Sequence, residues 1–186
     1  MIPRNMDAFE ARKILQAADL ICSAETVAAT VERLAKEITA QLDGSFPLVL
    51  AVMGGAVVFA GHLLPQLPFP LEFDYIHVSR YGNNTTGGGI NWKVEPHESV
   101  VGRTVLVLDD ILDEGETLAE VRRRVLAGGA SAFYAAVFSD KKIGRDKPIV
   151  PDFVGVTLPN RYVFGFGMDV SGAWRNLPAI YAVHED

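Results

Sequence analysis

The chain has 186 residues, 49% of them hydrophobic and 22% charged, and a formal net charge of −6. This length predicts one domain with enough chain to bury a core, and the composition excludes a disordered protein. The acidic balance argues against a nucleic-acid partner, because the basic residues cluster only at Arg122, Arg123 and Arg124. The single cysteine, Cys22, excludes an intramolecular disulfide bond and a cysteine-based zinc site.

Neither export nor membrane insertion is predicted from the sequence. Residues 1–13 lack the apolar core of a signal peptide. The longest apolar stretch, residues 48–61, contains three glycines and is too short to span a bilayer. We therefore expect a soluble cytoplasmic protein with no membrane partner.

Residues 6–42 have the alanine content and apolar spacing of helix. Ser23, with Glu25 two residues later, predicts a helix start, and residues 43–45 predict its end.

Strands and helices then alternate along the chain. Residues 48–52 predict a buried strand, residues 57–64 a helix, and residues 71–78 a strand with alternating faces. Residues 80–91 are rich in Gly, Asn and Thr and predict a long loop or a hairpin. The remaining predicted elements are a strand at 105–108, a helix at 117–126, a strand at 133–138, a polar loop at 141–151, and short strands at 153–156, 162–164 and 180–183. This alternation predicts an α/β fold with a doubly wound, mostly parallel sheet and flanking helices.

The strand at 105–108 is followed by the chain's most informative motif. Asp109 and Asp110 stand at its carboxyl end, Asp113 follows, and a turn with Gly115 and Thr117 enters the next helix. Ligands of open α/β sheets bind beyond the carboxyl ends of strands, and helix N-termini attract phosphate. Paired carboxylates suit ribose hydroxyls and Mg²⁺. The alternative is an ordinary strand–helix unit whose acidic residues favour the helix N-terminus.

This motif resembles the phosphoribosyl-diphosphate signature of the type I phosphoribosyltransferases. The resemblance implies that Asp109 and Asp110 hold the ribose hydroxyls and Mg²⁺. It also implies that residues 114–117 bind the 5′-phosphate, mainly through backbone N–H groups and the Thr117 hydroxyl. Glu114 and Glu116 depart from the family pattern, and their charge would not oppose the phosphate if both carboxylates faced solvent. The 5′-phosphate set is thus Glu114, Gly115, Glu116 and Thr117.

The same resemblance implies a pyrophosphate site. Gly54 and Gly55 end the strand at 48–52, where a glycine pair lets an anion approach the backbone. By itself the pair indicates a tight turn equally well, and Met53 stands where the family has a basic residue. Tyr81 matches the start of the family's flexible catalytic loop, which would exclude water from the reacting centre. Arg80 replaces the serine of that loop and would supply the charge that Met53 lacks. Arg175 would complete the pyrophosphate contacts.

The last third of the chain resembles the hypoxanthine-guanine phosphoribosyltransferases. The motifs, in order, are Lys141 after a strand, Pro-Asp-Phe-Val-Gly at 151–155, Tyr162-Val163, Gly-Phe-Gly-Met-Asp at 165–169 and Arg-Asn-Leu-Pro at 175–178. The resemblance implies that Lys141 bonds the purine 6-oxo group, Tyr162 stacks on the base and Val163 contacts it through backbone. Asp169 would contact the purine 2-position through its backbone and help to bind Mg²⁺. Asp113 would be the catalytic residue that takes or holds the N7 proton.

The resemblance therefore implies a purine-salvage enzyme that converts hypoxanthine or guanine and phosphoribosyl diphosphate into IMP or GMP. We expect one domain over residues 1–186, with a small base-binding subdomain built from both terminal segments, in a homodimer or homotetramer. Two alternatives stay open: a xanthine- or adenine-directed transferase, and a regulator that senses phosphoribosyl diphosphate. A regulator would be expected to carry a basic face or an added nucleic-acid domain.

Overall fold

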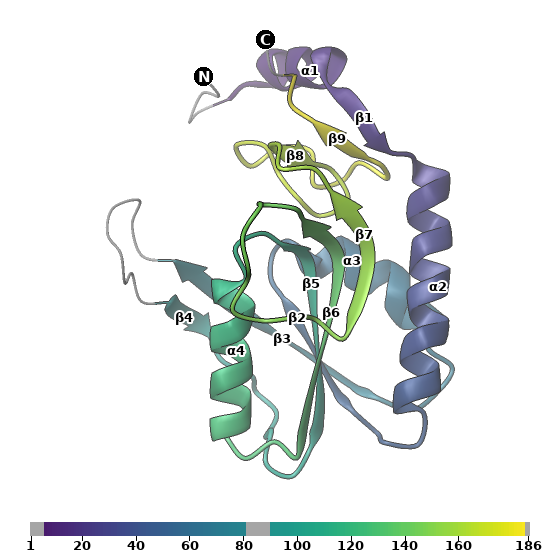
Figure 1. The fold of residues 1–186 in the computed structure, drawn as a ribbon, viewed down its shortest axis with the longest axis vertical. Coiled ribbons are helices and arrows are strands. Elements are labelled where there is room, and N and C mark those ends of the chain that lie inside the picture. Colours follow the sequence, from purple (N-terminus) through teal and green to yellow (C-terminus); the bar gives the residue numbers. More distant parts are fainter. Residues whose placement is uncertain (1–5, 81–89, 185–186) are drawn as a thin grey trace.

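The protein is built on a six-stranded sheet with a three-stranded sheet above it (Figure 1). The computed structural model describes residues 6–80 and 90–184. The large sheet consists of β2 (Leu48–Val52), β3 (Glu72–Arg80), β4 (Ile90–Val94), β5 (Thr104–Leu112), β6 (Ala132–Lys141) and β7 (Phe153–Leu158). Its strand order is β4-β3-β2-β5-β6-β7. Neighbouring strands from β3 to β7 are parallel, and β4 is antiparallel to β3.

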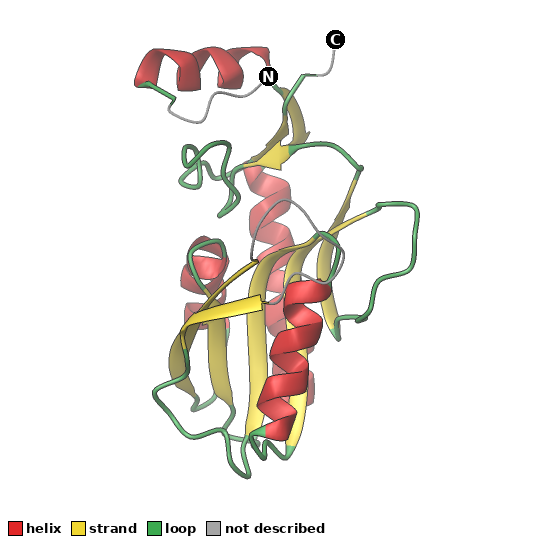
Figure 2. Ribbon diagram, turned by 90° about the vertical axis from the view of Figure 1, so that its left-hand side faces the viewer, coloured by secondary structure: helices red, strands yellow, loops and turns green. Residues whose placement is uncertain are grey.

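Helices cover both faces of this sheet, as Figure 2 shows. On one face α2 (Ala24–Leu42) and α3 (Ala56–Leu63) pack in one apolar cluster with Leu106 and Leu108 of β5. On the other face α4 (Glu116–Ala127) packs in a second cluster with Val105 and Val107. Successive residues of β5 are thus buried on opposite faces, which is why the run is continuously apolar. The prediction of a doubly wound, mostly parallel sheet is confirmed.

The small sheet joins the two ends of the chain. Its strands are β1 (Asp19–Cys22), β9 (Ile180–Ala182) and β8 (Val163–Phe164), paired antiparallel in the order β1-β9-β8. The N-terminal helix α1 (Ala8–Ala17) is fixed nearby, because Trp174 Nε1 donates a hydrogen bond to the Ala11 carbonyl at 2.8 Å. A short 3₁₀ helix, η1 (Leu64–Gln66), follows α3.

The prediction that residues 6–42 are helical throughout is wrong at β1. Residues 19–22 form a strand because β9, at the opposite end of the sequence, pairs with them. The local spacing of apolar residues cannot reveal a partner strand that is so distant in the sequence. The predicted helix start at Ser23 is confirmed, since Ser23 is the N-cap of α2 and its Oγ accepts from Thr26 N at 3.2 Å.

The predicted loop or hairpin at residues 80–91 is flanked by paired strands. β3 and β4 are antiparallel, and their register includes Arg80 opposite Ile90. Residues 81–89, including Tyr81, lie outside the described residues. Within the described ranges, no helix is long and apolar enough to cross a membrane.

β5 is longer than predicted, and this places the acidic motif. The strand continues through Asp109 and Asp110 to Leu112, in parallel register with β6 as far as Leu112 opposite Asp140. β2 pairs with β5 on its other side, from Leu48 opposite Val105 to Ala51 opposite Leu108. The carboxyl ends of β2, β5 and β6 therefore lie side by side at one edge of the sheet.

Candidate active site

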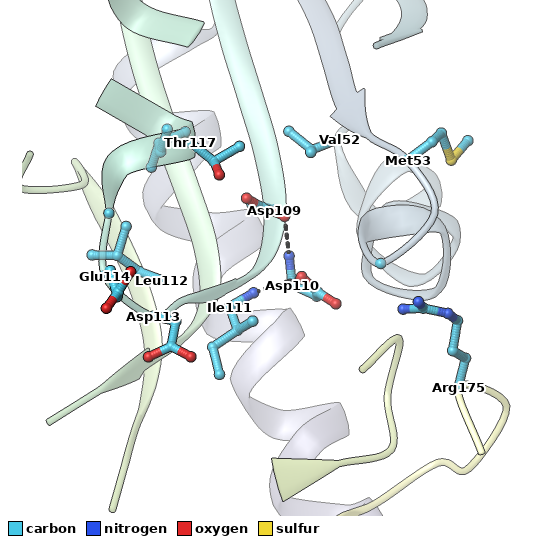
Figure 3. Close-up of a pocket in the computed structure, with 13 residues that line it drawn as sticks. Val52, Met53, Asp109, Asp110, Ile111, Leu112, Asp113, Glu114, Thr117 and Arg175 are labelled. Carbon is cyan, nitrogen blue, oxygen red and sulfur yellow. Dashed lines mark hydrogen bonds between the residues drawn. The ribbon is translucent and has the colours of Figure 1, made fainter. Parts of the chain in front are cut away.

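Two cavities open at this edge. The first, which we call the β5 cavity, has a volume of about 230 Å³ and is shown in Figure 3. It is lined by Val52, Met53 and Gly55 at the carboxyl end of β2, by residues 109–115, and by Thr117, Leu118 and Arg175. The second, the β8 cavity, has a volume of about 260 Å³ and lies toward the small sheet. It is lined by Asp110, Ile111, Asp113, Lys141, Tyr162, Val163, Met168, Asp169 and Arg175.

The acidic pair forms one side of the β5 cavity. Asp109 Oδ1 accepts a hydrogen bond from the backbone N of Asp110 at 3.0 Å, and Asp110 Oδ1 accepts one from Ile111 N at 2.9 Å (Figure 3). Burial raises the pKa of Asp109 well above its ordinary value, and the charge of Asp110 raises it further. Burial also raises the pKa of Asp110, although hydrogen bonds and the positive charge of Arg175 oppose this. Two crowded carboxylates of this kind favour a bound cation.

Gly55 allows the β2 loop to approach Asp110. A Cβ atom on Gly55 would lie 2.1 Å from Asp110 Oδ2, so any side chain there would collide with the carboxylate. Gly54 precedes it in the same turn, and the Met53–Gly54 peptide bond is cis. Of the predicted glycine pair, Gly55 is therefore brought against Asp110 from the neighbouring strand, whereas Gly54 is not part of the cavity lining.

The turn between β5 and α4 forms the floor of the β5 cavity. Gly115 is the N-cap of α4 and has φ 84°, a left-handed conformation that favours glycine. Thr117, in the first turn of α4, also lines the cavity. The exposed N–H groups at this helix start are suited to an anion.

The two glutamates that depart from the family pattern have different surroundings. Glu114 lines the β5 cavity, and its Oε1 accepts from Arg145 Nη2 at 2.7 Å. Arg145 thus offsets the charge of Glu114. This ion pair was not predicted from the sequence. Glu116 is exposed in the first turn of α4 and lies outside the cavity lining.

The four residues predicted to contact the base line one space, the β8 cavity. Lys141, Tyr162, Val163 and Asp169 all face it, together with Asp113. Lys141 Nζ donates to Asp113 Oδ2 at 2.8 Å. Burial raises the pKa of Tyr162, and the negative charge of Asp169 adds to this effect.

Arg175 stands where the two cavities meet. Its guanidinium points toward Asp110 in Figure 3, and its Nη1 donates to the Gly167 carbonyl at 2.6 Å. Its Nη2 lies 2.5 Å from Asp169 Oδ1, in an ion pair. Asp110, Ile111, Asp113 and Arg175 line both cavities, so the two spaces form one bipartite site.

The carboxylates fit a magnesium ion in part. Mg²⁺ is commonly held by one or two carboxylates together with substrate phosphates and waters, and Asp109 and Asp110 supply such a pair. Within residues 6–80 and 90–184, no group of three His, Cys, Asp or Glu side chains is arranged to hold a metal ion. Asp169 therefore does not complete a ready-made cluster with Asp109 and Asp110, because its carboxylate is paired with Arg175.

The structure leaves two predicted residues undetermined and adds others. Tyr81 is outside the described residues, and for Arg80 only the backbone position at the end of β3 is known. Ile111 lines both cavities and was not predicted, since an apolar residue between acidic ones gives no chemical signal. Arg145 and Lys147, from the loop after β6, were also missed.

The fold and the site together define the class of the protein. The chain belongs to the phosphoribosyl transferase domain family, which matches residues 19–171. The prediction of a type I phosphoribosyltransferase is therefore confirmed.

Relatives narrow the class to the purine-salvage branch. The chain is 34% identical over 162 residues to the hypoxanthine-guanine phosphoribosyltransferase of Bacillus subtilis, covering 87% of this chain and 90% of that protein. It is 35% identical over 162 residues to the bifunctional protein TilS/HprT of Listeria innocua, 87% of this chain but 25% of that protein's length. A solved hypoxanthine-guanine-xanthine phosphoribosyltransferase superposes with a TM-score of 0.82 at 30% identity, covering 90% of this chain and 97% of that one.

Proposed function

We propose that this protein transfers a 5-phosphoribosyl group from phosphoribosyl diphosphate to hypoxanthine or guanine, giving IMP or GMP and pyrophosphate. The observation that carries this proposal is that Asp113 lines both the β5 cavity, at the turn into α4, and the β8 cavity. A substrate bound across both cavities would place its ribose carbon beside this carboxylate. The reaction joins the purine N9 to C1′ as the bond from C1′ to pyrophosphate breaks.

Asp113 and Lys141 are suited to one edge of a purine. The 6-oxo group and N7 of a 6-oxopurine lie side by side on that edge. Lys141 Nζ would donate to the 6-oxo group, and Asp113 would accept the N7 proton as N9 attacks. Their separation of 2.8 Å allows one base to contact both.

The rest of the β8 cavity would hold the base. Tyr162 would stack on it, and Val163 would contact it through backbone groups at the start of β8. Asp169 would contact the 2-position of the base through its backbone.

The β5 cavity would hold the ribose and its 5′-phosphate. Asp109 and Asp110 would accept from the ribose hydroxyls. Backbone N–H groups of residues 114–117 and the Thr117 hydroxyl would bind the phosphate. The side chains of Glu114 and Glu116 are not needed for this binding.

The pyrophosphate would lie between the β2 turn and Arg175. Gly54 leaves the backbone of this turn open to an anion, Gly55 lets the turn approach Asp110, and Arg175 supplies a positive charge that Met53 does not. We propose that Arg80 and Tyr81 complete this side of the site. Mg²⁺, held by Asp109 and Asp110 with help from Asp169, would neutralise the leaving group's charge.

We propose that the protein acts in the cytoplasm. It would form one domain over residues 1–186 and assemble as a homodimer or homotetramer. The small sheet, built from both terminal segments, is the proposed base-binding subdomain.

A coupled assay with hypoxanthine, guanine, xanthine and adenine, with and without Mg²⁺, tests this function. We expect turnover of hypoxanthine and guanine that stops after exhaustive chelation of divalent cations. Turnover of xanthine at the same rate would extend the substrate range to that of the solved relative named for all three bases. Faster turnover of adenine, or none of any base, would contradict the proposal.

A further inference from the structure

The loop after β6 contains a lysine whose side chain is turned inward. Lys147 belongs to residues 142–152, between β6 and β7, and its side chain is only 11% exposed. A lysine ammonium in this position is costly unless it is fully hydrogen-bonded. The neighbouring Lys142, with its side chain 68% exposed, is an ordinary surface residue by comparison.

Three acceptors surround the Lys147 ammonium. Its Nζ donates to the Leu112 carbonyl at 2.7 Å, to the Lys141 carbonyl at 2.7 Å and to Asp140 Oδ1 at 2.6 Å. An ammonium has three donors, so these contacts use all of them. Lys147 therefore links neighbouring segments of the chain through its hydrogen bonds and has no donor left for a ligand.

The hydrogen bonds of Lys147 link the carboxyl ends of β5 and β6, at the point where the pairing of the two strands stops. The last register pair of the two strands is Leu112 opposite Asp140. Lys147 binds the carbonyl of Leu112, which directly precedes Asp113, and the carbonyl of Lys141 itself. It thus fixes the backbone at both members of the Lys141–Asp113 ion pair.

The same residue contacts the phosphate-binding turn. A Cβ atom on Gly115 would lie 3.3 Å from Lys147 Cβ, so the aliphatic stem of Lys147 packs beside this glycine. The stem and the ammonium therefore serve different neighbours. A substitution that keeps the stem and removes the donors separates the two contributions.

We propose that Lys147 is a positioning residue for base recognition, acting through the backbone at Asp113 and Lys141. The inference rests on the proposed function of those two residues. Without the ammonium, the two strand ends lose their common donor and the Lys141–Asp113 pair shifts relative to the β8 cavity. Small displacements of this kind are costly, because a misplacement of about 1 Å can reduce a rate by ~10²-fold.

The test compares Lys147→Met, Lys147→Arg and Lys142→Met in steady-state kinetics. Methionine keeps the stem beside Gly115 and removes all three donors. We expect Lys147→Met to reduce kcat/KM for hypoxanthine by about tenfold or more, with the KM for phosphoribosyl diphosphate changed by less than about twofold. Lys147→Arg should recover part of the loss, and Lys142→Met should match the native protein. Each variant is assayed well below its melting temperature, so that folded enzyme is compared.

Three results would overturn the proposal. One is an unchanged kcat/KM for hypoxanthine in Lys147→Met. Another is a KM for phosphoribosyl diphosphate that rises as much as kcat/KM for hypoxanthine falls, which would assign Lys147 to the packing of the phosphate turn. The third is an arginine variant no better than the methionine variant. Failure of the native protein to turn over hypoxanthine would instead defeat the proposed function, so the two failures are distinguishable.

Discussion

Lys141 and Asp113 come from the ends of two neighbouring parallel strands and meet in an ion pair of 2.8 Å. The lysine side chain is 13% exposed and the aspartate 48%, so the lysine is held within the site while the carboxylate faces the cavities. A lysine that keeps this contact still has two donors for a base. The pair thus presents a donor and an acceptor side by side, the pattern that complements a 6-oxopurine edge.

Asp113→Asn should fold normally and lose turnover by about 10²–10⁴-fold, the usual contribution of a general base. An amide cannot take a proton from N7, but it keeps the shape of the side chain. The KM for phosphoribosyl diphosphate should stay close to the native value, because Asp113 is not among the proposed phosphate contacts. Steady-state kinetics with both substrates varied make this measurement.

The matched control is Asp146→Asn, which changes an exposed carboxylate in the nearby loop. It should behave like the native protein. Full activity in Asp113→Asn would remove this residue from the mechanism.

Glu116→Lys should tighten phosphoribosyl diphosphate binding modestly, since it adds a positive charge beside the phosphate turn without lining the cavity. Its binding should also become more sensitive to salt, because exposed charges are screened. The variant should lose about 0.3–1 kcal/mol of stability, because a lysine opposes the dipole at a helix N-terminus. The KM at low and high ionic strength, with thermal unfolding, checks both effects.

Glu25→Lys is the control for this substitution. Glu25 occupies the first turn of α2, so the variant has the same helix-dipole cost at a helix start outside both cavity linings. Its KM should not change. Loss of binding in Glu116→Lys alone would show that the glutamate has a direct part in the site.

Asp109→Asn should raise the melting temperature at neutral pH while it removes most of the activity. The folded-state pKa of Asp109 lies well above its ordinary value of 3.8, mainly because of burial. The folded protein therefore binds this proton more tightly than the unfolded chain, and stability falls as the pH rises from near 3.8 through the folded pKa. Asparagine cannot ionise, so it avoids that loss. Each 1 kcal/mol gained raises the melting temperature by about 2–4 °C for a chain of this size.

Melting curves from pH 4 to pH 8, in buffer without divalent cations, measure this difference. The advantage of Asp109→Asn should be largest at pH 8 and should vanish near pH 4. Asp146→Asn, with its exposed carboxylate, should show no such trend. A destabilised Asp109→Asn at pH 8 would show that the ionised carboxylate is well solvated or paired in the fold.

Local patterns predicted β2, β5 and β6 because the central residues of these strands are buried on both faces. They did not predict β4, whose residues are only partly buried or exposed. The apolar run at 105–108 predicts a buried strand, and the acids that follow it predict a binding site at the end of that strand. Few other structures combine these two features. The same patterns failed at β1, where pairing with β9 decides the conformation of residues 19–22. They also ended β5 too early, because Asp109 and Asp110 are unusual within a strand and only the parallel register with β6 keeps them there.

From their motifs, the site residues could be assigned to phosphoribosyl-diphosphate binding or to base binding. The contacts between the two groups could not be predicted. That Asp113 pairs with Lys141 depends on the parallel pairing of β5 with β6, and that Glu114 pairs with Arg145 depends on how the loop after β6 folds back over the β5 turn. Polar loops give little signal about their contacts. Lys147 is the clearest case. Its sequence context does not distinguish it from other loop lysines, but in the structure its side chain is largely buried and fully hydrogen-bonded.

Lys141→Ala should reduce turnover of hypoxanthine and guanine strongly and narrow the difference between them and adenine. The native preference for 6-oxopurines follows from donor chemistry, because adenine presents an amino group where hypoxanthine presents an acceptor. A buried donor without its partner costs about 1–3 kcal/mol and more when charged, which corresponds to about five- to 150-fold or more in specificity. Turnover of all four bases by the native protein, Lys141→Ala and Lys142→Ala measures this. Lys142 is exposed, so its variant should match the native protein. An unchanged hypoxanthine rate in Lys141→Ala, with Lys142→Ala impaired, would move the role to the neighbouring lysine.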